Sequence, residues 1–318
     1  MNQMTNVRAK ASGKCILFGE HAVVYGRPAI AIPVTDVEAQ AELEAVEGQD
    51  GWQIFAPDLG KDYRLAEAAA DDPLAMIIRL TANHLGLESL PAARLRIRST
   101  IPLGRGLGSG AAISTAIVRA MADFMAATLT PAEVSALVYE VEKIYHGTPS
   151  GIDNMVIAFE QPVYFIKDRP IERLRVARPF TLVIADTGRV APTHEAVSDL
   201  RRRWQADRSF YERFFDQIGA ITDLSRIIIE EGTQDLSTLG RLMDNNQAIL
   251  EEIDISSPEL QRLVEAARQA GALGAKLSGA GWGGNMIALV RAESTARVVD
   301  ALRDTGAVQV IVTEVESG

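Results

Sequence analysis

Cysteine, net positive charge and long apolar runs are all scarce in this 318-residue chain. Its one cysteine, Cys15, excludes an intramolecular disulfide and fits a protein of the reducing cytosol. Lys and Arg number 32 against 42 Asp and Glu, so the net charge is −10 and the basic footprint of a nucleic-acid-binding protein is not expected. An acidic total still permits a locally positive pocket for an anionic small molecule.

Membrane-spanning and export segments are not expected either. The longest uncharged runs, 106–118 and 277–290, are shorter than the roughly 20 residues that cross a bilayer. Residues 1–11 lack the apolar core of a signal peptide, so we expect a cytoplasmic protein without a membrane partner. A composition of 47% hydrophobic and 23% charged residues is that of a globular protein, and the length predicts two domains.

Period-two patterns predict β-strands. Apolar and polar residues alternate over 35–46, and again over 94–98, as they do in half-buried antiparallel strands. Shorter runs rich in β-forming residues predict further strands at 162–166, 180–185, 285–290 and 308–315.

Helix start signals stand between these strands. Asp72-Pro73 predicts the start of a helix that ends near Gly86, and Ser257-Pro258 predicts one that ends near Gly271. Thr130 and Glu133 form a capping box at the start of another helix. Further helices are expected at 194–218, 235–253 and 294–305.

The order of these elements lacks regular βαβ alternation, which favours an α+β fold over a doubly wound sheet. A charged connection precedes Arg178-Pro179, and a new strand follows it. We therefore predict two domains, 1–178 and 179–318.

Three glycine-rich segments stand out, at 11–26, 102–112 and 276–285. The second places glycine at 104, 106, 108 and 110 and is followed by a small, apolar stretch, 111–127, that reads as a buried helix. A glycine loop leading into a helix N-terminus can bind phosphate, because free backbone N–H groups and the helix dipole converge there. A tight turn before a packed core helix is the alternative.

Two common nucleotide motifs are not supported. The chain contains no G-x-x-x-x-G-K-[ST] sequence, which excludes a P-loop NTPase. Residues 279–284 match G-x-G-x-x-G, but the residues that follow read as a strand and not as the helix that a dinucleotide site requires.

Three polar residues could carry chemistry, and each also has an ordinary structural interpretation. Lys14 stands between a glycine and an apolar strand expected at 15–18, and it could be a solvent-exposed lysine at the edge of that strand. Asp153 could be the N-cap of a helix over 154–159. Glu142 lies beside the apolar stripe of its helix without Lys or Arg three or four positions away, which hints at a metal or a distant cation, or else at a solvated flank.

Taken together, the three glycine-rich segments resemble the three motifs of the GHMP kinase superfamily, named after galactokinase, homoserine kinase, mevalonate kinase and phosphomevalonate kinase. Segments 19–26 and 146–154 resemble the mevalonate kinase family in particular, as does Asp186-Thr187-Gly188 followed by Thr193. The resemblance implies the two-domain α+β GHMP kinase fold. Its N-terminal domain is like domain 2 of ribosomal protein S5, its C-terminal domain is ferredoxin-like, and the active site lies in the cleft between them.

The reaction implied by the resemblance is ATP-dependent phosphorylation of the C5 hydroxyl of (R)-mevalonate, in isoprenoid precursor synthesis, by a homodimer. Asp153 would accept or orient the hydroxyl proton, and Lys14 would keep that carboxylate ionised and polarise the hydroxyl. Glu142 and Ser109 would hold Mg²⁺.

Two further sets of residues follow from the same resemblance. The residues expected around the ATP phosphates are Pro102, Leu103, Gly104, Arg105, Gly106, Leu107, Gly108, Ser109, Gly110, Ala111 and Ala112. Those expected around the substrate are Glu20, His21, Thr187, Gly279 and Ala280, with Arg189 as a guess for the substrate carboxylate.

Three positions depart from the family pattern. Gly110 stands where a serine usually binds Mg²⁺, Ser12 stands where proline is usual, and Trp282 stands where a small residue is common. Alternative functions are another GHMP small-molecule kinase, such as a phosphomevalonate kinase or a mevalonate 3-kinase, or a non-catalytic metabolite sensor, which only Gly110 supports. The presence of both Lys14 and Asp153 argues against the 3-kinase.

Overall fold

The computed structural model describes residues 6–46, 51–146, 149–189, 193–232 and 235–316. Its contacts divide the chain into two compact units. Two long strands, β1 (Asn6–Phe18) and β2 (Ala29–Ala45), contribute residues to both. The first unit comprises residues 1–13, 37–102 and 108–160, and the second comprises 14–36, 103–107 and 161–318.

The first unit contains a mixed sheet in the order β4-β3-β5-β2. Residues 39–45 of β2 run antiparallel to β5 (Ala93–Ser99), whereas β3 (Trp52–Ala56) runs parallel to β5. Strand β4 (Lys61–Arg64) completes the sheet antiparallel to β3. Buried residues alternate with partly buried ones over residues 37–44 of β2 and with exposed ones in β5, which confirms the two strands predicted from alternation.

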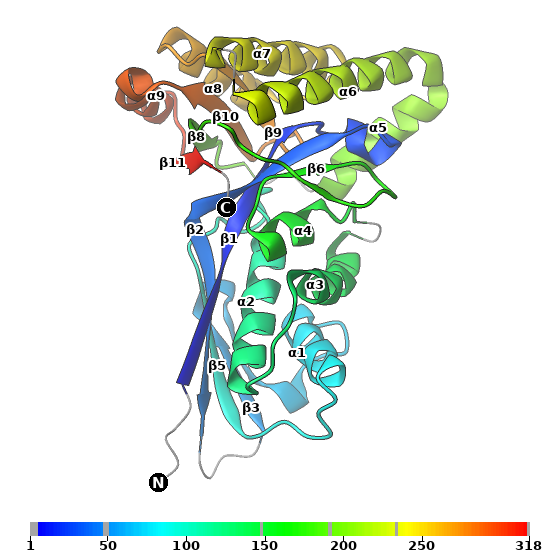
Figure 1. The fold of residues 1–318 in the computed structure, drawn as a ribbon, viewed down its shortest axis with the longest axis vertical. Coiled ribbons are helices and arrows are strands. Elements are labelled where there is room, and N and C mark those ends of the chain that lie inside the picture. Colours follow the sequence, from blue (N-terminus) through cyan, green and yellow to red (C-terminus); the bar gives the residue numbers. More distant parts are fainter. Residues whose placement is uncertain (1–5, 47–50, 147–148, 190–192, 233–234, 317–318) are drawn as a thin grey trace. The chain divides into compact units, whose positions relative to one another are not determined.

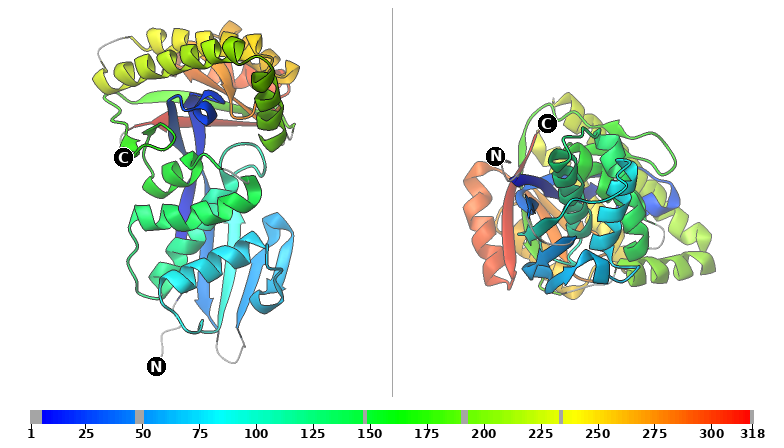
Figure 2. Two further views of the ribbon diagram at one scale, coloured as in Figure 1. Left: turned by 90° about the vertical axis from the view of Figure 1, so that its right-hand side faces the viewer. Right: turned by 90° about the horizontal axis from the view of Figure 1, so that it is seen from below.

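Four helices complete this unit: α1 (Pro73–His84), α2 (Ser109–Phe124), α3 (Pro131–His146) and α4 (Ile152–Phe159). Figures 1 and 2 show the cyan and green helices on one face of the blue strands. The predicted caps are present. An Asp72 carboxylate oxygen accepts from the Ala75 N–H at 2.9 Å, and the Thr130 and Glu133 side chains each accept from the other residue's N–H.

The second unit contains an antiparallel sheet in the order β11-β8-β10-β9. Its strands are β8 (Phe180–Asp186), β9 (Gly274–Ser278), β10 (Asn285–Val290) and β11 (Gln309–Val315). Residues 29–31 of β2 pair with β6 (Val163–Phe165), which also pairs with the short strand β7 (Glu172–Arg173). The strands predicted near 162, 180, 285 and 308 are therefore confirmed.

Helices of the second unit cover the four-stranded sheet, as Figure 1 shows for α7 and α8. Helix α7 and strand β9 are in close backbone contact, because a Cβ on Gly240 would lie 3.0 Å from the backbone nitrogen of Gly274, the first residue of β9. The core between sheet and helices includes Phe215, Leu250 and Leu277. The helices are α5 (Thr193–Ala206), α6 (Arg208–Glu231), α7 (Leu236–Glu252), α8 (Pro258–Gln269) and α9 (Ala292–Asp304). Short 3-10 helices in the described ranges are η1 (Ala22–Tyr25) in this unit and η2 (Pro57–Leu59) and η3 (Leu65–Glu67) in the first.

Two expectations about these elements were wrong. The single helix expected at 194–218 is two helices, because Asp207 caps α6 by accepting from the Phe210 N–H at 3.0 Å. Strand β1 begins at Asn6, well before the apolar run at 15–18 from which a strand was expected. The two compact units are each built from several separate segments, so they do not test a single boundary at Arg178-Pro179, which stays a prediction. None of the helices in the described ranges is long and apolar enough to cross a membrane.

Candidate active site

The second glycine-rich segment is a loop that leads into α2. Gly104, Gly106 and Gly108 have φ values of 67°, 83° and 73°, a left-handed conformation that residues with a side chain rarely adopt. Gly108 is the N-cap of α2 and has no side chain to occupy the first N–H groups of the helix. The first intrahelical bond runs from Ala112 N–H to Gly108 C=O at 2.9 Å, so the N–H groups just before it are available to an anion.

The earlier part of this loop is fastened inside the second unit. The Asn285 side-chain amide donates to the Arg105 carbonyl oxygen at 2.5 Å, and the Lys14 N–H donates to the Leu107 carbonyl oxygen at 3.0 Å. The Arg105 guanidinium approaches the buried Asp186 carboxylate at 3.4 Å. A Cβ at Gly284 would lie only 3.1 Å from the Arg105 carbonyl oxygen, so glycine permits this close approach.

Helices α2, α3 and α4 carry the carboxylates of the first unit and pack against one another (Figure 1). Glu142 on α3 is only 4% exposed, so it is not a solvated flank. Gly151, with φ 85°, is the N-cap of α4, so Asp153 lies in the first helical turn and is not the cap. The neighbouring Asn154 is buried, and its amide donates to the Ser135 carbonyl oxygen at 3.1 Å and hydroxyl at 2.8 Å, which fastens α4 to α3.

Lys14 lies on β1 and is only 4% exposed, so the interpretation as a solvent-exposed lysine was wrong. The adjacent Cys15 is a free, fully buried thiol, and burial raises its pKa to about 12.

The first and third glycine-rich segments meet within the second unit, and they bring together three residues predicted to lie around the substrate. The His21 ring Nε2 lies 3.2 Å from the Ala280 carbonyl oxygen, which can only accept, so Nε2 carries the donated proton. Burial lowers the pKa of His21 to about 4, which keeps the ring neutral near pH 7. Glu20 forms an ion pair with Lys276, and both side chains are completely buried.

Lys276 is a residue that sequence reasoning missed. It lies on β9, and the strand pattern gives no sign that its ammonium meets a carboxylate far away in the chain. Burial raises the pKa of Glu20 and lowers that of Lys276, and each partner's charge opposes that effect on the other. The signal available was a lysine at the first position of the third glycine-rich segment, within an otherwise uncharged stretch, 269–290.

Thr187 and Arg189 were also expected to lie around the substrate, and their contacts differ from those of Glu20 and His21. The Thr187 hydroxyl and N–H both donate to the Gly284 carbonyl oxygen at 2.9 Å, beyond the end of β8. Arg189 is exposed and pairs with Glu259 at 3.1 Å. Residues 147–148 of the mevalonate-kinase-like segment, and the side chain of Thr193, lie outside the residues that can be described.

The donor set of the first unit fits Mg²⁺ better than a transition metal. Within the described ranges, no three His, Cys, Asp or Glu side chains cluster so as to hold a metal by themselves. Mg²⁺ is usually bound by one or two carboxylates together with substrate phosphates and water. The buried Glu142 carboxylate and the Ser109 hydroxyl, at the first residue of α2, are oxygen donors of that kind.

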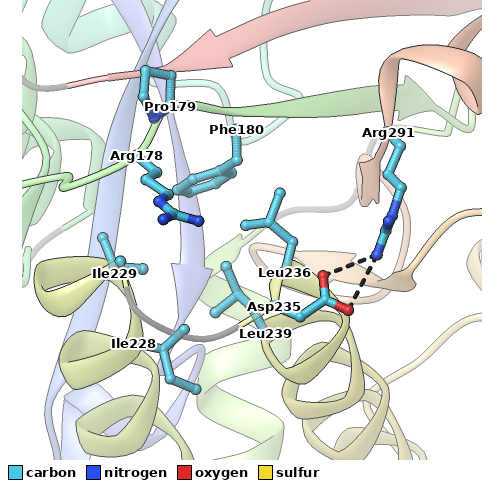
Figure 3. A pocket seen from close by; sticks show the side chains of 10 residues that line it. Arg178, Pro179, Phe180, Ile228, Ile229, Asp235, Leu236, Leu239 and Arg291 are labelled. Carbon is cyan, nitrogen blue, oxygen red and sulfur yellow. Dashed lines mark hydrogen bonds and ion pairs between the residues drawn. The ribbon is translucent and has the colours of Figure 1, made fainter.

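A pocket of about 230 Å³ in the second unit is formed by residues other than the predicted ones (Figure 3). Phe180, Ile228 and Leu239 form much of its apolar wall, and Arg291 pairs with Asp235 at its edge at 2.9 Å. It is therefore a separate feature from the glycine-rich segments.

Comparison with known proteins decides the family. The family model of the GHMP kinases N-terminal domain matches residues 73–161, and that of the GHMP kinases C-terminal domain matches residues 224–308. The mevalonate kinase of Pyrococcus horikoshii is 34% identical over 96% of this chain and 94% of its own length. That of Thermococcus sibiricus is 32% identical over 96% of this chain and 95% of its own. The chain belongs to the mevalonate kinase family of the GHMP kinases.

Solved mevalonate kinases have the same fold. The L. major mevalonate kinase in complex with R-mevalonate has a TM-score of 0.86 and 28% identity, covering 100% of this chain and 99% of its own. The Methanococcus jannaschii mevalonate kinase has a TM-score of 0.83 and 26% identity, again over 100% of this chain and 99% of its own. The expected two-domain GHMP kinase fold is thereby confirmed, and the chain is an ATP-dependent kinase.

Proposed function

We propose that this chain transfers the γ-phosphoryl group of ATP to the C5 hydroxyl of (R)-mevalonate, producing 5-phosphomevalonate and ADP. The observation that carries this proposal is the identity of at least 32% with the mevalonate kinases of T. sibiricus and P. horikoshii over 96% of the chain. The phosphomevalonate kinase of Streptococcus pneumoniae is 20% identical, a likeness that extends to the fold alone.

Phosphate binding is assigned to the N-terminus of α2. The N–H groups that precede the first intrahelical bond would bind an anion, and the helix dipole favours negative charge at this end. Phosphoryl transfer passes through a loose transition state, so holding the phosphates in place and neutralising their charge provides most of the catalysis. The glycines at 104, 106 and 108 allow the backbone to approach the phosphates without side chains in between.

Proton transfer is assigned to Asp153. Its carboxylate, at the start of α4, accepts the proton of the C5 hydroxyl as that oxygen bonds to the γ-phosphorus and the bond to the β-phosphate oxygen breaks. Lys14 supplies a positive charge that polarises the acceptor hydroxyl. Asn154 holds α4 against α3 and so keeps the carboxylate of the adjacent Asp153 in a fixed direction.

Mg²⁺ binding is assigned to Glu142 and Ser109. When bound, the ion would neutralise charge on the β- and γ-phosphates. Gly110 offers no hydroxyl where the family usually has one, so Glu142 carries more of the protein's share of the coordination in this chain.

The proposal is tested by ADP release from MgATP with (R)-mevalonate, phosphomevalonate, homoserine and galactose offered separately. We expect turnover with mevalonate only. Asp153→Asn should lower it by about 10²- to 10⁴-fold, whereas Asp304→Asn, at the exposed end of α9, is the matched control and should keep it. Turnover with another alcohol and none with mevalonate would contradict the assigned substrate. ATP binding without turnover on any acceptor would favour a metabolite sensor.

Two further assignments belong to the same proposal. A homodimer is expected from the resemblance to the family, and a cytoplasmic location is expected from the single cysteine. Light scattering of the purified chain tests the first, and fractionation of the native cells tests the second.

A further inference from the structure

Three side-chain links join the first glycine-rich segment to the third, all within the second unit. The Ser278 hydroxyl donates to the Ile16 carbonyl oxygen at 2.9 Å and accepts from the Ile16 N–H at 3.2 Å. His21 meets the Ala280 carbonyl oxygen, and Lys276 meets the Glu20 carboxylate. Residues 19–21, called the 19–21 corner below, are therefore linked to β9 and to the residues that follow it.

This corner has a backbone that needs such support. Gly19 has φ 94° and the non-glycine His21 has φ 59°, so two residues in three are left-handed. Gly19 also packs so closely that a Cβ there would lie 2.4 Å from the Pro28 carbonyl oxygen. Strained conformations of this kind persist only where the surroundings enforce them, and they gather at functional sites.

The Glu20 carboxylate depends on Lys276 for its orientation. Oxygen Oε1 receives the Lys276 ammonium, whereas Oε2 is buried without a hydrogen-bond partner among the described residues. The ammonium also donates to the Leu277 carbonyl oxygen at 2.7 Å, which fixes its own place on β9.

A fully buried ion pair is a poor way to gain stability, because taking both charges out of water costs about as much as their attraction returns. Its presence is better explained by the geometry that it enforces. An apolar pair of the same size would fill the space but would leave the corner free to adopt other conformations.

We propose that Lys276 is a positioning residue of the acceptor pocket, whose ammonium fixes the Glu20 carboxylate and with it the 19–21 corner. This inference rests on the proposed function, which assigns Glu20 and His21 to the mevalonate pocket. Lys276 itself is buried and does not touch the substrate. Its loss should therefore weaken mevalonate binding and leave MgATP binding, assigned to the α2 N-terminus, unchanged.

The test is Lys276→Met, which removes the charge while keeping a side chain of similar length. We expect the KM for mevalonate to rise at least about tenfold, the ratio that 1.4 kcal/mol of lost binding produces. The KM for MgATP should stay within about twofold of the wild type, since a general distortion of the active site would raise both KM values and partial unfolding would lower only the apparent kcat. Lys61→Met breaks the Lys61–Asp72 pair of the first unit and is the matched control, with both KM values unchanged.

A second variant covers the case in which Lys276→Met does not fold. Lys276→Gln keeps an N–H donor but is shorter and uncharged, and it should raise the KM for mevalonate at least about threefold by the same relation. An unchanged KM for mevalonate in either folded variant would overturn the inference, as would an equal rise in both KM values. Wild-type enzyme without turnover on mevalonate would overturn the proposed function together with this inference, so the two failures are distinguishable.

Discussion

Mild acid should destabilise this protein through His21. Burial lowers the pKa of His21 from its ordinary value of 6.5 to about 4, so between these two values the unfolded chain binds a proton that the folded chain excludes. The stability that depends on the neutral ring is thus fully present above pH 6.5 and is lost as the pH falls toward 4. For one group with these pKa values, the linkage relation gives a loss of about 2 kcal/mol between pH 7 and pH 5.

The assay is urea unfolding of the wild type and of His21→Asn at pH 7 and pH 5. Asparagine is chosen because it tolerates the left-handed backbone that position 21 requires. Other groups titrate in the same interval, but they are shared by both proteins and cancel in the difference. The wild type should therefore lose about 2 kcal/mol more than the variant over this interval.

His84→Asn is the matched control, because His84 is half-exposed on α1 and pairs only loosely with Glu133 at 3.4 Å. It should lose as much stability as the wild type. Equal losses in the wild type and His21→Asn would refute the reasoning that His21 is held neutral by burial.

Four more outcomes follow from the structure. Gly19→Ala should lower the free energy of unfolding, measured in urea, by at least about 2 kcal/mol. The new Cβ would lie 2.4 Å from the Pro28 carbonyl oxygen, on a left-handed backbone. Unchanged stability would contradict that packing. Cys15 should react with a thiol reagent at pH 8 only after unfolding, since it is buried with a pKa of about 12, and rapid labelling of the folded protein would count against this. Asp153→Asn should lower kcat by about 10²- to 10⁴-fold with the Tm preserved, and near-normal turnover would exclude it as the base. Glu142→Gln should raise the Mg²⁺ concentration needed for half-maximal rate, and an unchanged titration would exclude Glu142 as a ligand.

Local signals predicted the helix starts well. Asp72 and the Thr130–Glu133 pair accept from N–H groups three residues away, so the nearby sequence is enough to predict these hydrogen bonds. Asp207 uses the same interaction to start α6, but the apolar periodicity around it masks the break. Strand β1 was placed too late because its first residues are polar or small, and its pairing with β2 is not visible locally.

The site was predicted unevenly for the same reason. The glycines at 104, 106 and 108 predict a loop, because glycine permits the left-handed backbone found there and weakens a helix or a strand locally. The burial of Lys14 and Glu142 depends on elements far away in the chain, so their ordinary interpretations could not be rejected from sequence. Lys276 and Glu20 are 256 positions apart, and only the folded chain brings them together.

The most direct test of the central claim is the identity of the product formed from MgATP and (R)-mevalonate. Phosphorus–proton correlation in NMR distinguishes a phosphate on the C5 methylene from one on the tertiary C3 oxygen. The assignment predicts a phosphorus signal coupled to the C5 methylene protons, which appears with wild-type enzyme and at least about 100-fold more slowly with Asp153→Asn. A phosphate on C3, or ADP without any phosphorylated mevalonate, would contradict it.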